Sequence, residues 1–367
     1  MSEIKVNSIK GVGASAAAIT VNNSDGTCTA NITNKPNRNL IINGAMQVAQ
    51  RGTSFSGTAQ QYTLDRMQMN TAGNDEIAQT EQATVTSGGA YTSGFRKCLK
   101  IINGNQTSGA GATDVVHLKM VLEAQDIANS GWNYTSNSNF VTLSFWIKSS
   151  VAQDFPITLR SEDGTRQVYN MTTGSLSADT WTKITKTISG NSNLQFDNNN
   201  AAGLTLFINA FVGTDYTTGG LAQNAWSAWS GAKQGDNMTS TWYTTNDATL
   251  EITGLQLEVG SVATDFEHRS FGQELALCQR YFQHLGRDNQ LVFTTQTLGS
   301  YNPAMFLVLP VEMRATPTTT INQTTNNNGT ISTGDLSPRN LAINIARSGS
   351  SAAMQQAEFD IKFSAEL

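Results

Sequence analysis

The sequence predicts an all-β protein: a jelly-roll-like β-sandwich with a short N-terminal β arm, one linking helix and a small C-terminal β domain. Many short segments alternate apolar and polar residues with a period of two, which is typical of half-buried strands. Asn, Gly and Ser turns separate these segments, and a convincing helical pattern occurs at one place. We expect four parts, at residues 1–38, 39–268, 269–286 and 287–367.

Residues 1–38 hold short alternating pieces, Ile4 with Val6 and Ile19 with Val21, and a turn signal at Asp25-Gly26. A segment of this size cannot build an independent core. We therefore expect it to pair with other chains or to lie on a larger body, as an attachment arm would.

Residues 39–268 predict the sandwich through a series of amphipathic strands. The two clearest strands carry apolar residues at every second position: Val116, Leu118, Met120 and Leu122, then Val141, Leu143, Phe145 and Ile147. Further strands are expected within 181–188, 204–211 and 250–259. In the last of these the apolar parity shifts by one residue across Gly254, which indicates a β-bulge.

One helix is predicted between Phe271 and Leu285. Ser270 and Gln273 have the spacing of a capping box, and Gly286 stands where a helix would end. Apolar residues recur at alternating intervals of four and three, at Phe271, Leu275, Cys278, Phe282 and Leu285. A helix this short cannot bury such a seam alone, so it needs its own β domains or copies of itself. We expect it to lie near the axis of a homotrimer.

Residues 287–367 predict a small β domain. Residues 304–317 are an apolar run ended by prolines, and residues 320–335 are a polar hairpin or loop tract. The chain ends in a clean alternation that predicts a paired strand, with Phe359, Ile361, Phe363, Ala365 and Leu367 on one face. A domain this small is more easily stable when several copies pack around an axis.

Composition excludes several classes of protein. Charged residues make up 14% of the chain and the net charge is −5, which fits neither a nucleic-acid-binding surface nor intrinsic disorder. Three widely spaced cysteines, Cys28, Cys98 and Cys278, favour folding in a reducing compartment. With no secretion signal and no membrane-spanning segment visible, we expect folding in a bacterial cytoplasm.

The histidines and glycine motifs predict no metal site, no cofactor and no enzyme. His117, His268 and His284 do not pair by spacing with zinc ligands, and His117 is expected on a solvated strand face. The chain has no G-x-S-x-G motif and no phosphate-binding loop with a lysine.

The carboxylates likewise predict no enzyme. Asp163 and Asp197 lie in separate loops, so they do not predict a glycosidase pair. A calcium ion near Asp215 and Asp236 stays possible, although no calcium-loop motif supports it.

An aromatic tract among small polar residues is the candidate binding site. Its members are Tyr216, Trp226, Trp229, Trp242 and Tyr243. Flat rings beside amides and hydroxyls suit saccharides, because sugar C–H faces stack on rings while polar groups bind the hydroxyls. The alternative is that these tryptophans close the end of the sandwich or lie in a subunit contact. Trp132 and Tyr134 form a weaker candidate, and Trp146 and Trp181 are expected to pack within strands.

Two segments carry a family resemblance. NLIINGAMQVAQRG, which starts at Asn39, and LEVGSVATDFEHRSFGQELALCQRYFQ, which starts at Leu257, resemble the shared module of phage tail-fibre and virion-appendage proteins. The resemblance covers roughly residues 39–285 and implies a sandwich similar to a carbohydrate-binding module. Phe282 stands where that family more often has Tyr. The first 38 residues resemble the start of fibre proteins from marine short-tailed phages.

The resemblance implies a non-enzymatic virion protein, a tail-fibre or tail-appendage subunit that attaches to a host surface glycan through weak, multivalent contacts. Such a protein would assemble in the host bacterial cytoplasm as a homotrimer and would bind other phage tail or virion proteins through its N-terminal arm. Two alternatives stay open. One is a structural adaptor or capsid decoration protein without receptor binding, and the other is a polysaccharide-degrading appendage.

Overall fold

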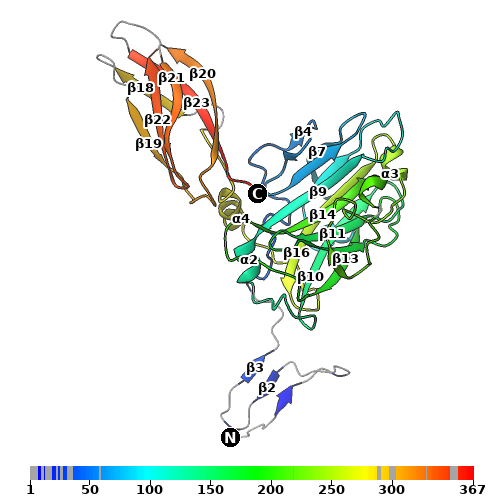
Figure 1. Cartoon of the computed structure of the whole chain (residues 1–367). Helices are drawn as coiled ribbons and strands as arrows, with labels where there is room; N and C mark the ends of the chain where they lie inside the picture. Colours follow the sequence, from blue (N-terminus) through cyan, green and yellow to red (C-terminus); the bar gives the residue numbers. More distant parts are fainter. Residues whose placement is uncertain are drawn as a thin grey trace.

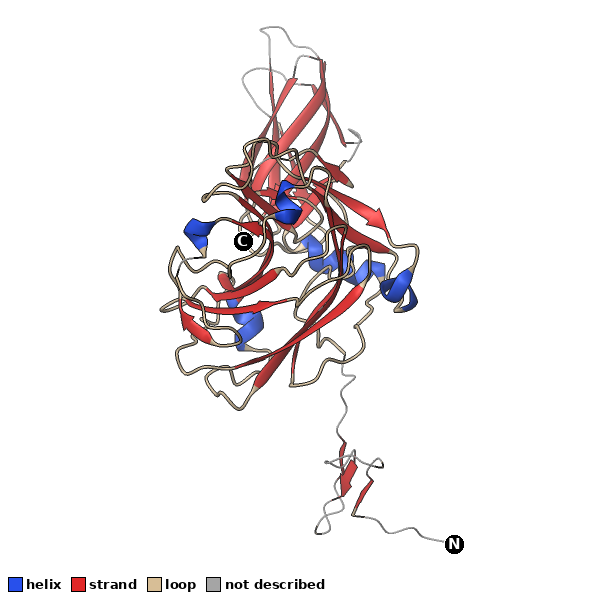
Figure 2. Cartoon of the chain, turned by 90° about the vertical axis from the view of Figure 1, so that its right-hand side faces the viewer, coloured by secondary structure: helices blue, strands red, loops and turns tan. Residues whose placement is uncertain are grey.

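The computed structural model confirms the all-β, jelly-roll-like fold (Figure 1). It describes residues 7–9, 12, 19–21, 24, 28–30, 36–57, 59–217, 219–286, 291–296, 303–327, 329–347 and 354–367. Two antiparallel sheets form the sandwich, and two further sheets form the C-terminal domain. The helices are short pieces beside the strands (Figure 2), and none of those in the described ranges has the length and apolar character of a membrane span.

The sandwich pairs a six-stranded sheet with a seven-stranded sheet. The first has the strand order β13-β10-β16-β8-β7-β4. Its strands are β4 (Ser54–Phe55), β7 (Gln79–Thr84), β8 (Lys97–Ile102), β10 (Phe140–Ser149), β13 (Thr182–Ser189) and β16 (Thr249–Val259). The second has the order β15-β12-β11-β14-β9-β6-β5. Its strands are β5 (Gln61–Tyr62), β6 (Gln68–Ala72), β9 (Val115–Glu123), β11 (Pro156–Ser161), β12 (Gln167–Thr172), β14 (Ala202–Val212) and β15 (Trp226–Ala228).

The predicted strand faces and the bulge are confirmed. The alternating apolar residues of β9 and β10 are buried together in the main core. Opposite β10, Ser144 pairs with Gln256 but Trp146 pairs with Thr253, so Phe145 faces two residues of β16. Gly254 has φ +67° there, and a Cβ on it would lie 2.6 Å from the ring of Phe95. Only glycine meets both requirements without strain.

The linking helix is shorter than predicted. Ser270 and Gln273 form the predicted capping box at the start of α4 (Phe271–Gln279). The helix ends at Gln279, and β17 (Phe282–Leu285) follows as a strand paired with β23. Gly286 (φ +67°) lies just after that strand rather than at a helix end. Phe271 is 55% exposed whereas Cys278 and Phe282 are buried, so the predicted five-residue seam does not form one helix face. Pairing with β23 has overridden the apolar spacing.

The remaining helices are single turns. They are α1 (Gly88–Thr92), α2 (Ala124–Ala128), α3 (Thr241–Thr244) and the 3-10 turn η1 (Thr214–Tyr216). Trp146 and Trp181 pack around α1 in a small second core with Phe95 and Cys98, on the outer face of the six-stranded sheet. The prediction that these two tryptophans are packing residues is confirmed.

The C-terminal domain is a smaller sandwich. One sheet joins β17, β18 (Leu291–Gln296) and β20 (Thr318–Asn327) to the central β23 (Met354–Ser364), and the other orders β19 (Ala304–Val308), β22 (Asn340–Arg347) and β21 (Gly329–Leu336). Phe359, Ile361 and Phe363 are fully buried, which confirms the terminal strand. The tract 320–335 is neither a hairpin pair nor a loop, because β20 and β21 belong to different sheets.

The arm contains a three-stranded antiparallel sheet of β1 (Ser8–Ile9), β2 (Ile19–Val21) and β3 (Cys28–Ala30). The predicted Ile19–Val21 strand is confirmed. Ile4, Val6 and the Asp25-Gly26 turn lie outside the described residues.

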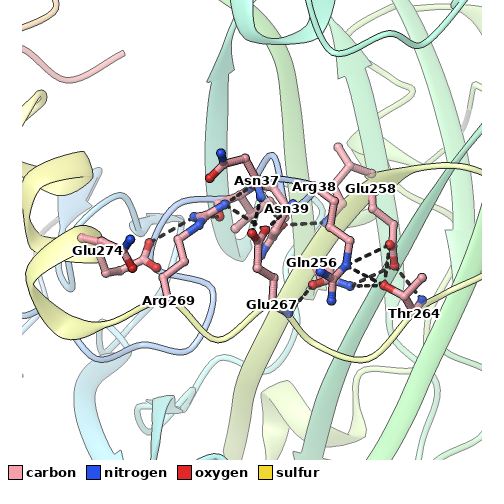
Figure 3. Close-up of polar contacts among 12 residues, drawn as sticks. Asn37, Arg38, Asn39, Gln256, Glu258, Thr264, Glu267, Arg269 and Glu274 are labelled. Atoms are coloured by element: carbon pink, nitrogen blue, oxygen red, sulfur yellow. Dashed lines mark hydrogen bonds and ion pairs between the residues drawn. The ribbon is translucent and has the colours of Figure 1, made fainter. Parts of the chain in front are cut away.

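The two motifs that carry the family resemblance meet in a polar clasp that joins the start of the sandwich chain to its end (Figure 3). Glu267 accepts hydrogen bonds from the backbone N–H groups of Asn37 and Asn39. Arg269 donates to the carbonyl oxygens of Asn39 and Ile41, and Glu274 of α4 accepts from the N–H of Asn43.

The side chains of the clasp continue along β16. Arg38 donates to Thr264 Oγ1 at 2.8 Å and pairs with Glu258 at 3.6 Å. The Asn39 amide donates to the carbonyl of Leu255 and accepts from the N–H of Leu257. Buried charge-assisted hydrogen bonds of this kind fix geometry strongly. The motif residues therefore hold the sandwich closed.

Buried charges also fix the C-terminal domain to the sandwich. Glu366 pairs with Arg66 and, at 2.9 Å, with Arg51. The two guanidinium groups lie 3.5 Å over the ring of Tyr281 and 3.6 Å over the ring of Phe282. The two arginines belong to the sandwich, and Tyr281, Phe282 and Glu366 come from the chain after it. The end of the chain is thus locked against the sandwich.

Candidate functional site

A row of polar side chains crosses the outer face of the seven-stranded sheet, opposite the core. Strand register places Asn70 of β6 and Asn209 of β14 on either side of His117 of β9. Thr158 of β11 continues the row, with its hydroxyl oxygen 3.5 Å from Asn209 Nδ2 and 3.4 Å from Oδ1 of Asn170 in β12. Five strands each supply one polar residue.

Much of this row has no hydrogen-bond partner. Within the described ranges, no partner is found for both ring nitrogens of His117, Oδ1 of Asn70 and Asn209, or Nδ2 of Asn170. His117 is 5% exposed, Asn209 1% and Asn170 0%. Buried polar groups are nearly always satisfied, because each unpaired one costs about 1–3 kcal/mol. Such a cluster marks this sheet face as a candidate binding site.

The prediction of a solvated His117 is wrong. The ring is buried edge-to-face against Phe207, with 5.0 Å between centroids, because residues after β14 fold over this sheet face. Burial, with the positive charges of Lys119 and Arg160, lowers its pKa from 6.5 to about 3. His117 is therefore a neutral imidazole that can both donate and accept a hydrogen bond.

Residues 213–217 and 219–237, together called the strap below, cover the row. The Gln234 carbonyl accepts from the Thr158 hydroxyl at 3.0 Å, and a Cβ on Gly235 would lie 2.9 Å from Val212 Cγ2. Only a residue without a side chain can approach the sheet this closely. The strap also contains β15, whose pairing with β12 extends the sheet.

Trp229, just after β15, is the half-buried ring above the row. Its ring lies 5.3 Å from the guanidinium of Arg160 and 5.6 Å from that of Arg166. Both arginines pair with Glu162, at 2.8 Å and 3.1 Å. Arg160 also lies 5.1 Å over Phe207, which in turn touches His117. A continuous stack thus leads from the surface to the polar row.

A small cavity of about 10 Å³ opens beside this stack, enough space for about one water molecule. Its lining joins the strap to the sheet: His117, Thr158, Arg160, Phe207, Trp229, Lys233 and Gln234. The site therefore combines a flat ring, guanidinium and ammonium donors, and an unpaired imidazole. These are the elements of saccharide recognition.

The structure separates the predicted aromatic residues. Trp242 and Tyr243 are fully buried in α3, so their assignment to the binding surface is wrong. Trp242 donates to the carbonyl of Thr249, and Tyr243 stacks on Phe211 with 4.2 Å between centroids. Alternation cannot reveal this burial, because one helical turn places both rings in the end of the sandwich.

Trp226 serves the fold as well. Its Nε1–H donates to the Ser189 carbonyl at 2.7 Å, and its ring packs edge-to-face on Tyr169, 5.2 Å away. It thus ties β15 to the end of β13 in the other sheet. Trp229 and the half-buried Tyr216 are the members of the predicted set left at the surface of the strap.

The weaker aromatic candidate belongs to the core. Trp132 is 3% exposed, and Tyr134 packs against it and against Phe196, with 4.9 Å between the Tyr134 and Phe196 centroids.

Two histidines lie away from the strap. His268 is exposed and contacts Phe95 and Phe266, while His284 pairs with Asp360 at 3.0 Å from strand β17, not from a helix turn.

The loop aspartates are arranged differently from the prediction. Asp163 accepts a hydrogen bond from the backbone N–H of Asp197, so these residues are neighbours rather than isolated. Asp236 accepts from Gln223, and no group of three metal-ligating side chains gathers among the residues that were described.

Sequence reasoning missed the row itself. Its members are spread from residue 70 to residue 209 and join only through strand pairing. One signal was present, because His117, Thr158 and Asn209 each stand between two residues that face the core. Polar residues on the outward parity of neighbouring strands can form a site, but sequence gives no pairing order for them.

Comparisons with known proteins add the following. No protein-family model and no curated protein matches the chain. Among solved structures, the enzymatically active domain of bacteriophage CBA120 tailspike protein 4 aligns over 62% of this chain and 22% of that chain, with 8% identity and a TM-score of 0.33.

A family 11 carbohydrate-binding module from Clostridium thermocellum aligns over 59% of this chain and 95% of its own, with 11% identity and a TM-score of 0.25. A family 30 carbohydrate-binding module aligns over 60% and 87%, with 13% identity and a TM-score of 0.25. These scores assign no function, and the fold rests on the sheets described above.

Proposed function

We propose that this chain is a non-enzymatic subunit of a phage tail fibre or tail appendage that binds a host surface glycan at the Trp229 site. The observation that carries the binding role is the unpaired polar row beneath a half-buried tryptophan. Hydroxyl groups of a sugar both donate and accept, so they suit a neutral imidazole flanked by amides. The sugar ring would stack on Trp229.

The phage assignment rests on the two resembling motifs, whose residues form the clasp. In this proposal the arm (residues 1–38) binds other phage tail or virion proteins, and the chain acts in the virion. Deletion of residues 1–35 is expected to leave the sandwich folded and to abolish incorporation into particles. Normal occupancy of the truncated chain on purified virions would contradict an anchoring arm.

The proposed active form is a homotrimer. Exposed apolar side chains support further packing: Phe271 and Leu277 on α4, and Phe306 and Val308 on β19. Light scattering at micromolar concentration should give three times the 39.4 kDa chain mass, and Leu277→Asp with Phe306→Asp should reduce it to one. A wild-type monomer would overturn the trimer. Phe282 of the predicted seam is 4% exposed, so its substitution would disturb folding rather than assembly.

Glycan binding is tested with Trp229→Ala. Loss of a stacked ring should weaken binding to an immobilised host glycan panel and lower host-cell adsorption severalfold. Tyr91→Ala is the matched control, since Tyr91 is an exposed ring of α1, stacked on Arg96 beside the six-stranded sheet and away from the strap. Unchanged adsorption by Trp229→Ala would favour the structural adaptor or capsid decoration. Release of reducing ends from a bound polysaccharide would instead identify a degrading appendage.

A further inference from the structure

The charges around Trp229 differ in sign from the chain as a whole. Arg160, Arg166 and Lys233 lie around Trp229, and Lys119 lies near His117 and Arg160, on a chain of net charge −5. Glu162 pairs with the two arginines. Burial lowers the pKa of Lys119, and the like charge of nearby Arg160 lowers it further. The negative charge of Glu162 partly opposes this shift. These four cations outnumber the one carboxylate that pairs with two of them.

Both carboxylate oxygens of Glu162 already have partners within the chain. Its Oε1 accepts from Arg160 and from the Thr205 hydroxyl at 2.6 Å, and its Oε2 pairs with Arg166. The neighbouring Asp163 holds the Asp197 N–H instead. Across the described ranges, neither Lys119 nor Lys233 lies within 4.0 Å of a carboxylate. The positive charge is therefore available to a ligand.

The geometry points to an anionic saccharide, and we infer that the Trp229 site binds a sugar carrying a carboxylate or sulfate group. This inference rests on the proposed glycan binding and specifies its ligand class. The sugar ring stacks on Trp229, and the anionic group enters the cavity between Arg160, Lys233 and His117. One oxygen of such a group is about the size of the water molecule that this cavity can hold.

The unpaired row explains why a sugar suits this surface better than a simple anion. The neutral imidazole of His117 lines the cavity and gains hydrogen bonds from sugar hydroxyl groups, whereas the cations contact the charged substituent. A free anion without hydroxyl donors would satisfy the cations and leave the imidazole without both of its partners. A neutral sugar would satisfy the imidazole and leave the cations without a counter-charge.

Isothermal titration calorimetry with three probes tests the inference: tetragalacturonate, the same oligosaccharide fully methyl-esterified, and a sulfated galactan tetrasaccharide. At 50 mM salt the carboxylate form should bind about tenfold tighter than its ester, and 500 mM salt should remove most of that difference. The sulfated probe shows whether the anion can be either group.

Lys233→Met should reduce the preference for acid over ester to about threefold or less. Lys183→Met is the matched control, because it removes one exposed lysine from the opposite sheet and should leave the preference unchanged. Intrinsic tryptophan fluorescence and circular dichroism confirm that each variant is folded.

The outcomes separate this inference from the function on which it rests. Equal binding of acid and ester, or binding to neutral glycans alone, would overturn the anionic specificity and leave glycan binding intact. Binding of no saccharide at all would overturn the proposed function. Tighter binding of a single-stranded DNA 12-mer than of either acidic sugar would show a general polyanion surface and would also overturn the inference.

Discussion

The buried imidazole of His117 should make the sandwich sensitive to mild acid. Its folded pKa is about 3, against an ordinary value of 6.5 that we assign to the unfolded chain. Because the folded value is the lower one, the full contribution to stability is present above pH 6.5 and is lost as the pH falls towards 3. Between pH 7 and pH 5 the unfolded chain gains a proton that the folded chain excludes, which amounts to about 2 kcal/mol.

The test compares urea unfolding of the wild type and His117→Gln at pH 7 and pH 5. Most carboxylates stay ionised over this range in both proteins, so the difference between their pH dependences isolates His117. The wild type should lose about 2 kcal/mol more of its free energy of unfolding than the variant does. His268→Gln is the control, since it removes an exposed ring on the opposite side of the sandwich and should behave as the wild type.

A direct measurement uses the ring resonances of His117 in an NMR titration. They should stay those of a neutral imidazole down to pH 4. Parallel pH dependences in wild type and His117→Gln, or titration of the ring near pH 6, would refute the buried, unpaired state on which the site depends.

Three further results are expected. Urea unfolding should show that Trp226→Ala lowers the free energy of unfolding by about 2–3 kcal/mol, whereas Trp229→Ala changes it by less than about 1 kcal/mol. Equal effects of the two substitutions would contradict the different packing of the two rings. Glu366→Gln should destabilise the junction between the domains by about 3 kcal/mol, because it leaves the buried Arg66 without its charge partner. Limited proteolysis between the two domains should become faster, and unchanged cleavage would count against this role of Glu366. Burial and the nearby Glu366 raise the pKa of Tyr62 to about 12, so stability should fall as the pH rises from 10 towards 12; a Tyr62→Phe variant that falls as steeply would disprove this.

The clasp shows why a motif can be informative about fold yet silent about ligands. Glu267 and Arg269 bind backbone groups and pair with each other, and Arg38 pairs with Glu258, so these charged groups already have partners within the sandwich. Arg280 and Tyr281 of the same motif both bond to Glu123, which is fully buried. Burial alone would raise the pKa of Glu123, but these hydrogen bonds outweigh it and lower the pKa. The motifs identify the module and its junction, not its binding surface.

Features that depend on neighbours along the chain could be predicted from the residues alone. Alternation of apolar residues identified strands such as β9 and β10, because successive side chains point to opposite faces. The parity shift at Gly254 located the bulge, and Ser270 with Gln273 located the start of α4. Each of these is a local rule of backbone geometry.

Tertiary structure alone decided the rest. Whether an aromatic ring is a platform or a core residue depends on what the strap covers, so Trp229 differs from Trp242 despite similar surroundings in sequence. The end of α4 was set by β23, a strand some 80 residues later in the chain, which pairs with Phe282–Leu285. The polar row exists because strand order brings Asn70, His117 and Asn209 together. Pairing energy depends on distant partners, and a single sequence does not reveal which partners meet.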